Sequence, residues 1–263
     1  MNVRPTLICF FFLSLQDGNS GLANAQISVF TGTEGEDIRV ECYFSRSGTT
    51  RFFCKNKCKQ GDLLIETTDV TAQSGRYGME YKYETVEPEA NVSVSISQLT
   101  RSDSGLYSCG LNGSTMLNVY FRIIVVDALL TGNPPGVKTF HKTFGDNVVV
   151  ACNLSDYGEN TYFCKERCED KDILVQTYNL SAQRDRYSIE YVRGSPSGGI
   201  VYVTISQLTK SDSGLYSCCM ERPLSPDAYH EFRINVTDAP TTSEPNTTLP
   251  DTDTPSPRGT CTH

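Results

Sequence analysis

Cysteine is the residue type in this chain whose spacing most clearly indicates chemistry. Two pairs stand four residues apart, in the segments FCKNKC and FCKERC, which suits a local disulfide or half of a zinc site. Zinc would need four ligands, and the chain has only three histidines, none of them near either pair. We therefore predict no metal site and two local disulfides, Cys54 with Cys58 and Cys164 with Cys168. Each small loop should contribute ~2 kcal/mol to stability.

The other reactive side chains give no support for catalysis. The histidines His141, His230 and His263 are scattered, and no cysteine is expected to be free beside one of them. No glycine-rich phosphate loop follows a predicted strand. We therefore expect a binding protein that is not an enzyme and has no cofactor.

The N-terminal segment has the layout of a signal peptide. Arg4 precedes the apolar run 7–15, and small residues end the segment at Ala25. The apolar run is about half the roughly 20 residues that a membrane-spanning helix needs. Secretion places the chain where thiols pair. Cys9 leaves with the signal, so ten of the eleven cysteines remain.

Charge and hydropathy limit the partners. The net charge is −8, so nucleic acid is not expected as a partner. No later stretch approaches 18 uncharged apolar residues, because Asp127 interrupts the best candidate, residues 123–130. We expect a cell-surface protein if a transmembrane segment is missing from this sequence, and a secreted protein otherwise.

An internal repeat shows that the chain contains a duplicated domain. A shift of 110 residues aligns Cys42 with Cys152 and Cys54 with Cys164. Farther along, at a shift of 109, the segment SISQLTRSDSGLYSC meets TISQLTKSDSGLYSC. A period near 110 residues is a whole domain, not a solenoid unit.

The predicted elements are short strands. Apolar and polar residues alternate with period two at 38–44, 92–96 and 201–205, which suits strands with one face in a core and one in water. Turns rich in Gly, Ser and Asn separate them, so we predict an all-β antiparallel sandwich for each copy. Residues 131–136 (TGNPPG) mark a short hinge. The Thr-, Ser- and Pro-rich residues after 237 predict an extended stalk.

The motif DSGLYSC, at 103–109 and 212–218, resembles the sixth-strand signature of variable-type immunoglobulin domains. Each copy has a tyrosine two residues before its last cysteine, as in the tyrosine corner of that fold. The resemblance implies long-range disulfides, each contributing ~4 kcal/mol, and a structural ion pair at the base of each sandwich; the alternative role of these charges is ligand contact. The implied pairs are Cys42 with Cys109, Cys152 with Cys218, Arg76 with Asp103, and Arg186 with Asp212.

One departure from that family is the absence of tryptophan. Phe53 and Phe163, each eleven residues after the first cysteine of its domain, should fill the core position that tryptophan usually takes. We predict a signal peptide over 1–25, V-type domains over 26–128 and 137–237, a linker over 129–136, and a stalk over 238–263.

The aromatic-Cys-Lys-x-x-x-Cys hairpin and the strand after it resemble the polymeric immunoglobulin receptor and the related leukocyte mono-immunoglobulin-like (CMRF-like) receptors. This resemblance covers residues 26–236. It implies an immune cell-surface receptor that binds an extracellular ligand, either polymeric antibody or an anionic lipid or protein, and serves transport or signalling. The alternatives are a soluble secreted decoy and a homophilic adhesion protein.

A basic segment in the first domain is a candidate contact for an anionic ligand. It has five cations and no acid, whereas the matching stretch of the second domain is locally negative. The alternative is a solvated, lysine-rich hairpin. The five residues are Arg46, Arg51, Lys55, Lys57 and Lys59.

The loops 110–117 and 220–227 occupy the place of the third hypervariable loop and differ between the copies, so the two domains are expected to bind different partners. Cys219 and Cys261 could pair with each other or link two chains into a dimer. Six sequons predict glycosylation at Asn91, Asn112, Asn153, Asn179, Asn235 and Asn246.

Overall fold

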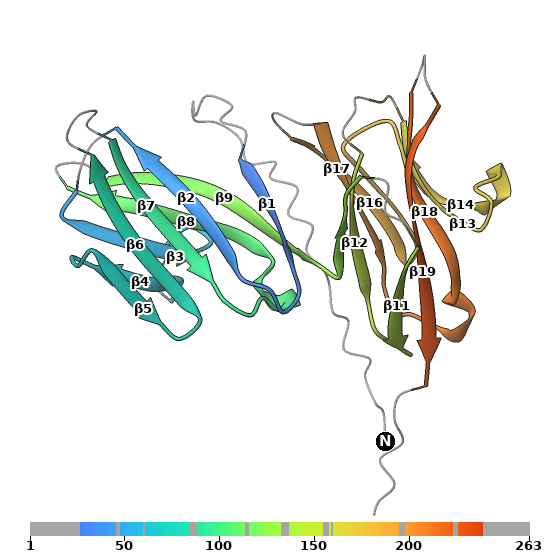
Figure 1. The fold of residues 1–263 in the computed structure, drawn as a ribbon, viewed down its shortest axis with the longest axis horizontal. Coiled ribbons are helices and arrows are strands. Elements are labelled where there is room, and N and C mark those ends of the chain that lie inside the picture. The colour runs from blue at the N-terminus through green and yellow to red at the C-terminus, as the bar shows by residue number, and fades with distance from the viewer. Residues whose placement is uncertain are drawn as a thin grey trace, which may run out of the picture.

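The computed structural model describes residues 27–238 apart from 46–47, 60, 85–88, 114–115, 133–136, 155–157, 159, 195–197 and 223–225. The predicted signal peptide and nearly all of the predicted stalk lie outside these residues. The described region is almost entirely β-strand and forms two tandem sandwiches (Figure 1), which confirms the predicted fold class.

The first sandwich packs two sheets against each other. Its front sheet has the order β1-β9-β8-β3-β4, and its back sheet has the order β2-β7-β6-β5. The strands are β1 (Ser28–Thr33), β2 (Ile38–Phe44), β3 (Thr50–Lys55), β4 (Leu63–Thr67), β5 (Thr71–Ser74), β6 (Tyr77–Glu84), β7 (Glu89–Ile96), β8 (Gly105–Asn112) and β9 (Met116–Val126), with the 3₁₀ helix η1 (Arg101–Asp103) before β8.

The second sandwich repeats this topology with one addition. Its front sheet has the order β11-β19-β18-β13-β14, and its back sheet has the order β10-β12-β17-β16-β15. The elements are β10 (Ala128–Leu130), β11 (Lys138–Thr143), β12 (Val148–Asn153), β13 (Asn160–Lys165), η2 (Asp170–Asp172), β14 (Ile173–Thr177), β15 (Ser181–Arg184), β16 (Tyr187–Gly194), β17 (Gly198–Ile205), η3 (Lys210–Asp212), β18 (Gly214–Glu221) and β19 (Ala228–Thr237).

The added strand, β10, corrects the predicted linker. Residues 129 and 130 were expected to belong to the linker, but they pair in parallel with β12 at Ala151 and Cys152. Ala128 and Leu130 are buried and pack in the second core. A strand of three residues is too short to be recognised from the alternation of apolar and polar residues alone.

Each core is built around a disulfide and a stack of aromatic rings. Phe53 is fully buried and stacks on Tyr107 at a centroid distance of 5.6 Å and on Phe121 at 6.4 Å. Phe163 is also fully buried and stacks on Tyr216 at 5.5 Å. A phenyl ring therefore takes the central place in both sandwiches and keeps the interior apolar.

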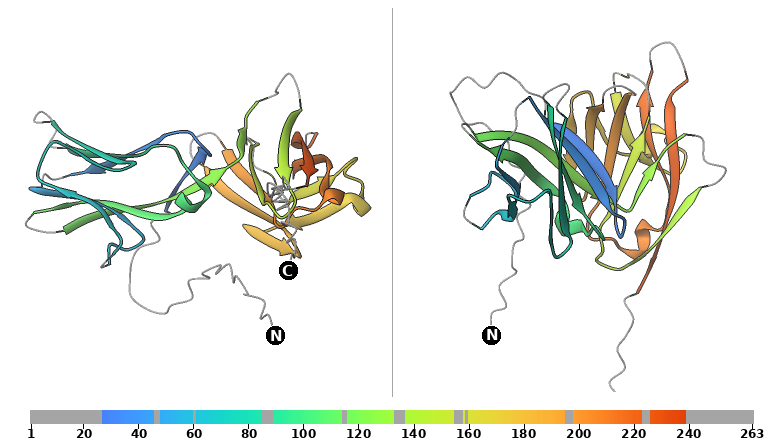
Figure 2. Two further views of the ribbon diagram at one scale, coloured as in Figure 1. Left: turned by 90° about the horizontal axis from the view of Figure 1, so that it is seen from below. Right: turned by 60° about the vertical axis from the view of Figure 1, so that its left-hand side comes forward.

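The two sandwiches meet along one seam. In Figure 1 the strands β12, β17 and β16 lie on the side of the second sandwich that faces the first, while β13, β14, β18 and β19 lie on the far side. The left view in Figure 2 shows the same separation into two bodies. A small apolar cluster joins Ile124 and Val126 of β9 to Ala151 and Tyr202 across this seam.

Candidate binding surface

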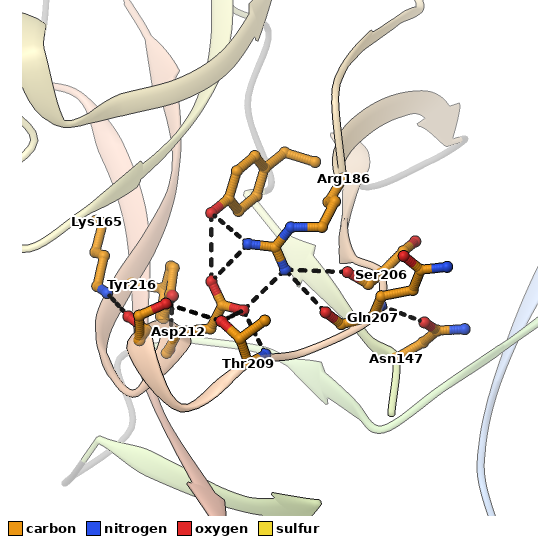
Figure 3. Close-up of polar contacts among 10 residues, drawn as sticks. Asn147, Lys165, Arg186, Ser206, Gln207, Thr209, Asp212 and Tyr216 are labelled. Carbon is orange, nitrogen blue, oxygen red and sulfur yellow. Dashed lines mark hydrogen bonds and ion pairs between the residues drawn. The ribbon is translucent and has the colours of Figure 1, made fainter. Parts of the chain in front are cut away.

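The charges that recur at the base of each sandwich are fully occupied by contacts within their own domain. Arg186 donates to both carboxylate oxygens of Asp212, at 2.8 and 2.9 Å, and to the carbonyl oxygens of Ser206 and Gln207 (Figure 3). The backbone N–H of Thr209 donates to the same carboxylate at 2.7 Å. Burial alone would raise the pKa of Asp212, but these hydrogen bonds outweigh it and lower the pKa to about 2.

The first domain repeats the arrangement. Arg76 donates to Asp103 at 2.9 and 2.8 Å, and the side chain of Asp103 is 3% exposed. In both domains the tyrosine of the DSGLYSC motif donates to the backbone carbonyl of that aspartate at 2.7 Å. Because each carboxylate is buried and saturated with donors, the two aspartates are placed to stabilise the fold and not to contact a ligand.

Four disulfides are present among the described residues, two long-range and two local. Cys42 pairs with Cys109 and Cys152 with Cys218, while Cys54 pairs with Cys58 and Cys164 with Cys168. Each local disulfide closes a tight turn with two residues at positive φ, such as Asn56 at 57° and Cys58 at 55° in the first domain. The bond therefore stiffens a hairpin whose backbone is under local strain.

Cys219 is a buried free thiol, 4% exposed. It stands where the first domain has Gly110, across from Tyr162 in the strand register. Burial raises the pKa of the thiol to about 12. Its sulfur lies close to those of Cys164 and Cys168, but those two form a disulfide and so lack the thiolate that a metal ligand needs. Burial also argues against a disulfide to a second chain through Cys219.

The basic segment of the first domain is smaller at the surface than the sequence indicates. Arg51 is only 8% exposed, and its guanidinium lies 3.9 Å from the ring centroid of Tyr81 and donates to the carbonyl of Thr68. The prediction of Arg51 as a ligand contact is therefore wrong. Its guanidinium packs on an aromatic face inside the domain, an environment that charge counting cannot reveal.

Two of the five predicted cations remain clearly available. Lys55 donates to the carbonyl of Ser102 at 2.8 Å, so its charge is used to close the base of the domain. Lys57 and Lys59 are exposed on the hairpin. Arg46 lies outside the described residues. The surface that we call the hairpin patch therefore consists of Lys57 and Lys59.

The matching hairpin of the second domain has a different charge pattern. Lys165 donates to the carbonyl of Ser211 at 2.7 Å, as Lys55 does in the first domain. Arg167 is exposed in the place of Lys57, and Lys171 pairs with Glu169 at 2.8 Å. The acidic turn Asp170–Asp172 follows directly. This hairpin is therefore not an equivalent of the hairpin patch.

The loops in the place of the third hypervariable loop also differ in structure. In the first domain Asn112 ends β8 and is exposed. In the second domain Tyr162 donates to Asp227 at 2.8 Å, and Arg222 donates to the carbonyl of Pro226 at 2.7 Å. The first contact ties the second loop to its own front sheet, and the second contact lies within the loop.

The predicted glycosylation acceptors fall into three groups. Asn112, Asn179 and Asn235 are exposed, whereas Asn91 and Asn153 are half-buried. Asn246 lies outside the described residues. Exposure makes the first three the more accessible acceptors.

Among the described residues no helix is long and apolar enough to cross a membrane.

Sequence reasoning missed the residues of the seam. Arg122 of β9 donates to both carboxylate oxygens of Glu190 in the second domain, one of them at 3.0 Å. Thr31 and Tyr202 share a hydrogen bond of 2.6 Å. A position-by-position comparison of the two copies could have found the seam. It shows that Tyr202 replaces Ser93 on the outer face of the sheet.

Known proteins resemble this chain over both domains. The immunoglobulin V-set domain model matches residues 26–125. The chain is 27% identical to the polymeric immunoglobulin receptor of Rattus norvegicus over 192 residues, covering 70% of this chain and 25% of the relative. It is 29% identical to that of Mus musculus over 200 residues, covering 70% of this chain and 24% of the relative.

A solved teleost fish polymeric Ig receptor ectodomain covers 81% of this chain and 97% of its own, at 17% identity and a TM-score of 0.31. The chain spans about a quarter of the length of the curated relatives that it matches.

Proposed function

We propose that this chain, which is similar to polymeric immunoglobulin receptors and whose residues 26–125 match the immunoglobulin V-set domain model, is a receptor ectodomain that binds polymeric immunoglobulin. It would act at the cell surface or as a secreted protein, in transport or signalling. The observation that supports this most is the similarity to receptors of that name over 70% of the chain, which includes both sandwiches.

The first domain is the proposed contact with antibody. The V-set model matches residues 26–125, which form this domain, and Asn112 of its hypervariable-like loop is exposed at the end of β8. Its disulfide-closed hairpin lies at the other end of the front sheet from this loop, because Lys55 pairs with Tyr107 whereas Thr50 pairs with Asn112. A glycan on the exposed Asn112 would stand in this surface, so occupancy of that sequon should reduce binding.

A second candidate is recognition of an anionic lipid or protein face by the hairpin patch. Lys57 and Lys59 are both exposed, and the matched second-domain residues are Arg167 and Glu169. Two lysines give weak, salt-sensitive attraction. This candidate therefore predicts binding that disappears at moderate salt, whereas a packed protein interface keeps most of its affinity.

The test compares the two ligands side by side. The secreted ectodomain, residues 26–237, is titrated with polymeric antibody and with phosphatidylserine vesicles at low and moderate salt. The double variant Lys57→Glu/Lys59→Glu reports on the hairpin patch, and Arg167→Glu in the second domain is the matched control. Antibody binding that persists at moderate salt supports the receptor proposal. Vesicle binding that only Lys57→Glu/Lys59→Glu abolishes would replace it with the anionic-ligand candidate.

A further inference from the structure

The outer face of the back sheet is built differently in the two domains. In the first domain it is a solvated polar surface. Arg39 donates to Glu41 at 2.9 Å and to Glu80 at 2.7 Å, and Ser93 donates to Glu41 at 2.8 Å. Such a network is what an outward sheet face carries when water covers it.

In the second domain the matched positions are apolar. They form the outer face of β12, β17 and β16, where an isolated immunoglobulin sandwich would meet water. The replacements, aligned by the sequence repeat, are Val149 for Arg39, Ala151 for Glu41, Val192 for Lys82, Ile200 for Asn91 and Tyr202 for Ser93.

The first domain covers this apolar face with the edge formed by β1 and β9. Ile124 and Val126 form one cluster with Ala151 and Tyr202, and all four are at most 8% exposed. Val29 of β1 packs against the same cluster. Burial of apolar surface is the main favourable term in association.

Polar contacts fix the orientation around this cluster. Glu190 matches Glu80 of the first domain, which pairs with Arg39. In the second domain Val149 stands in the place of Arg39, and Glu190 instead accepts hydrogen bonds from the guanidinium of Arg122 across the seam. Thr31 and Tyr202 meet at 2.6 Å. The bidentate ion pair and the hydroxyl contact, together with the apolar cluster, define one orientation of the first domain relative to the second.

Asp127 closes the seam where the chain passes from one domain to the next. Its side chain is 6% exposed, and it receives Lys142 at 2.6 Å, Arg101, and the backbone N–H of Val149 at 2.8 Å. Its own N–H donates to the carbonyl of Val149 at 2.8 Å. The chain at Asp127 is therefore bound to both domains.

We propose that the outer face of β12, β17 and β16 is a docking surface that only the second domain possesses, and that it holds the two domains in one fixed orientation. The five matched replacements are an observation independent of the contacts themselves, since they are present in the sequence. A ligand that touches both domains therefore meets a preset arrangement, and the front sheet of the second domain stays uncovered.

The edge of the first domain that contacts the docking surface has a polar counterpart in the second domain. The second domain is therefore not built to make the same contact with a further domain. Ile124 is replaced by Asn235 and Val126 by Thr237, both exposed. Asn235 is also a glycosylation acceptor. A head-to-tail contact that repeated would give filaments. With a polar edge that carries a glycosylation acceptor at one end and the polar Arg39 face at the other, this contact is not set up to repeat.

The test exchanges residues between the two copies. In the secreted chain, Val149→Arg/Tyr202→Ser gives the second domain the polar residues of the first. Small-angle X-ray scattering should show an increased radius of gyration, and hydrogen exchange should speed up at the amides of Asp127 and Val149. The control, Arg39→Val/Ser93→Tyr on the open face of the first domain, should leave both measurements at their wild-type values.

A second variant keeps the test decisive if the first one does not fold. Ile124→Asn/Val126→Thr copies the sequence Asn-Val-Thr of the second domain and places a glycan in the seam. The edge tolerates these residues in β19, so the first domain should fold and the seam should open. The proposal is overturned if either folded variant keeps the wild-type scattering profile and amide protection, or if the wild-type chain already samples many orientations.

Discussion

Arg186 and Asp212 form a two-point ion pair at the base of the second domain, with N–O distances of 2.8 and 2.9 Å and an aspartate side chain that is 4% exposed. The pair links the start of β16 to the turn before β18. Breaking such a buried pair leaves one charge without its partner, which costs more than the pair contributes.

We predict that Asp212→Asn lowers the free energy of unfolding by about 2 to 4 kcal/mol. Urea denaturation of the disulfide-intact chain measures this loss. The control is Lys171→Ala, which removes an exposed ion pair with Glu169 and should cost less than about 1 kcal/mol. Equal effects of the two substitutions would show that burial of Asp212 does not matter.

The same carboxylate should make stability depend on pH. Its folded-state pKa is about 2, below the ordinary value of 3.8, so its contribution is complete above about pH 4 and is lost as the pH falls through 2. The shift corresponds to about 2 kcal/mol. The difference in unfolding free energy between wild type and Asp212→Asn should therefore shrink as the pH falls from 6 to 2. A difference that stays constant over this range would contradict the assignment.

Cys219 should be unreactive in the folded chain. The thiol is 4% exposed and burial raises its pKa to about 12, so almost no thiolate is present at neutral pH. We expect iodoacetamide to leave Cys219 unmodified in the native protein and to alkylate it after denaturation without reductant, as seen by peptide mass spectrometry. Rapid alkylation of Cys219 in the native state would show that the front sheet of the second domain opens.

The fold could be predicted from the sequence because its signals are local or repeated. Period-two alternation, the DSGLYSC motif and the placement of Phe53 and Phe163 each depend on residues near one another in the chain. The repeat then gave two copies of the same arrangement. The structure adds that both phenyl rings stack on the tyrosine of the motif, which sequence spacing does not show.

The binding surface was less predictable for a physical reason. The five cations do not form one surface, because Arg51 lies on the same face of β3 as the buried Phe53, whereas Lys57 and Lys59 lie in the turn after β3. Arg51 therefore lies inside, over Tyr81, and Lys55 is bound to Ser102. The seam was missed because Val149 and Tyr202 are unremarkable core-type residues until they are compared with Arg39 and Ser93.

Binding to antibody of different valency tests the proposed function most directly. The secreted ectodomain, residues 26–237, is titrated with polymeric and with monomeric antibody at equal concentrations of antibody units, in moderate salt, by surface plasmon resonance. The account predicts saturable binding to the polymeric form that is much tighter than any binding to the monomer. No binding to either form, or equal binding to both, would contradict it.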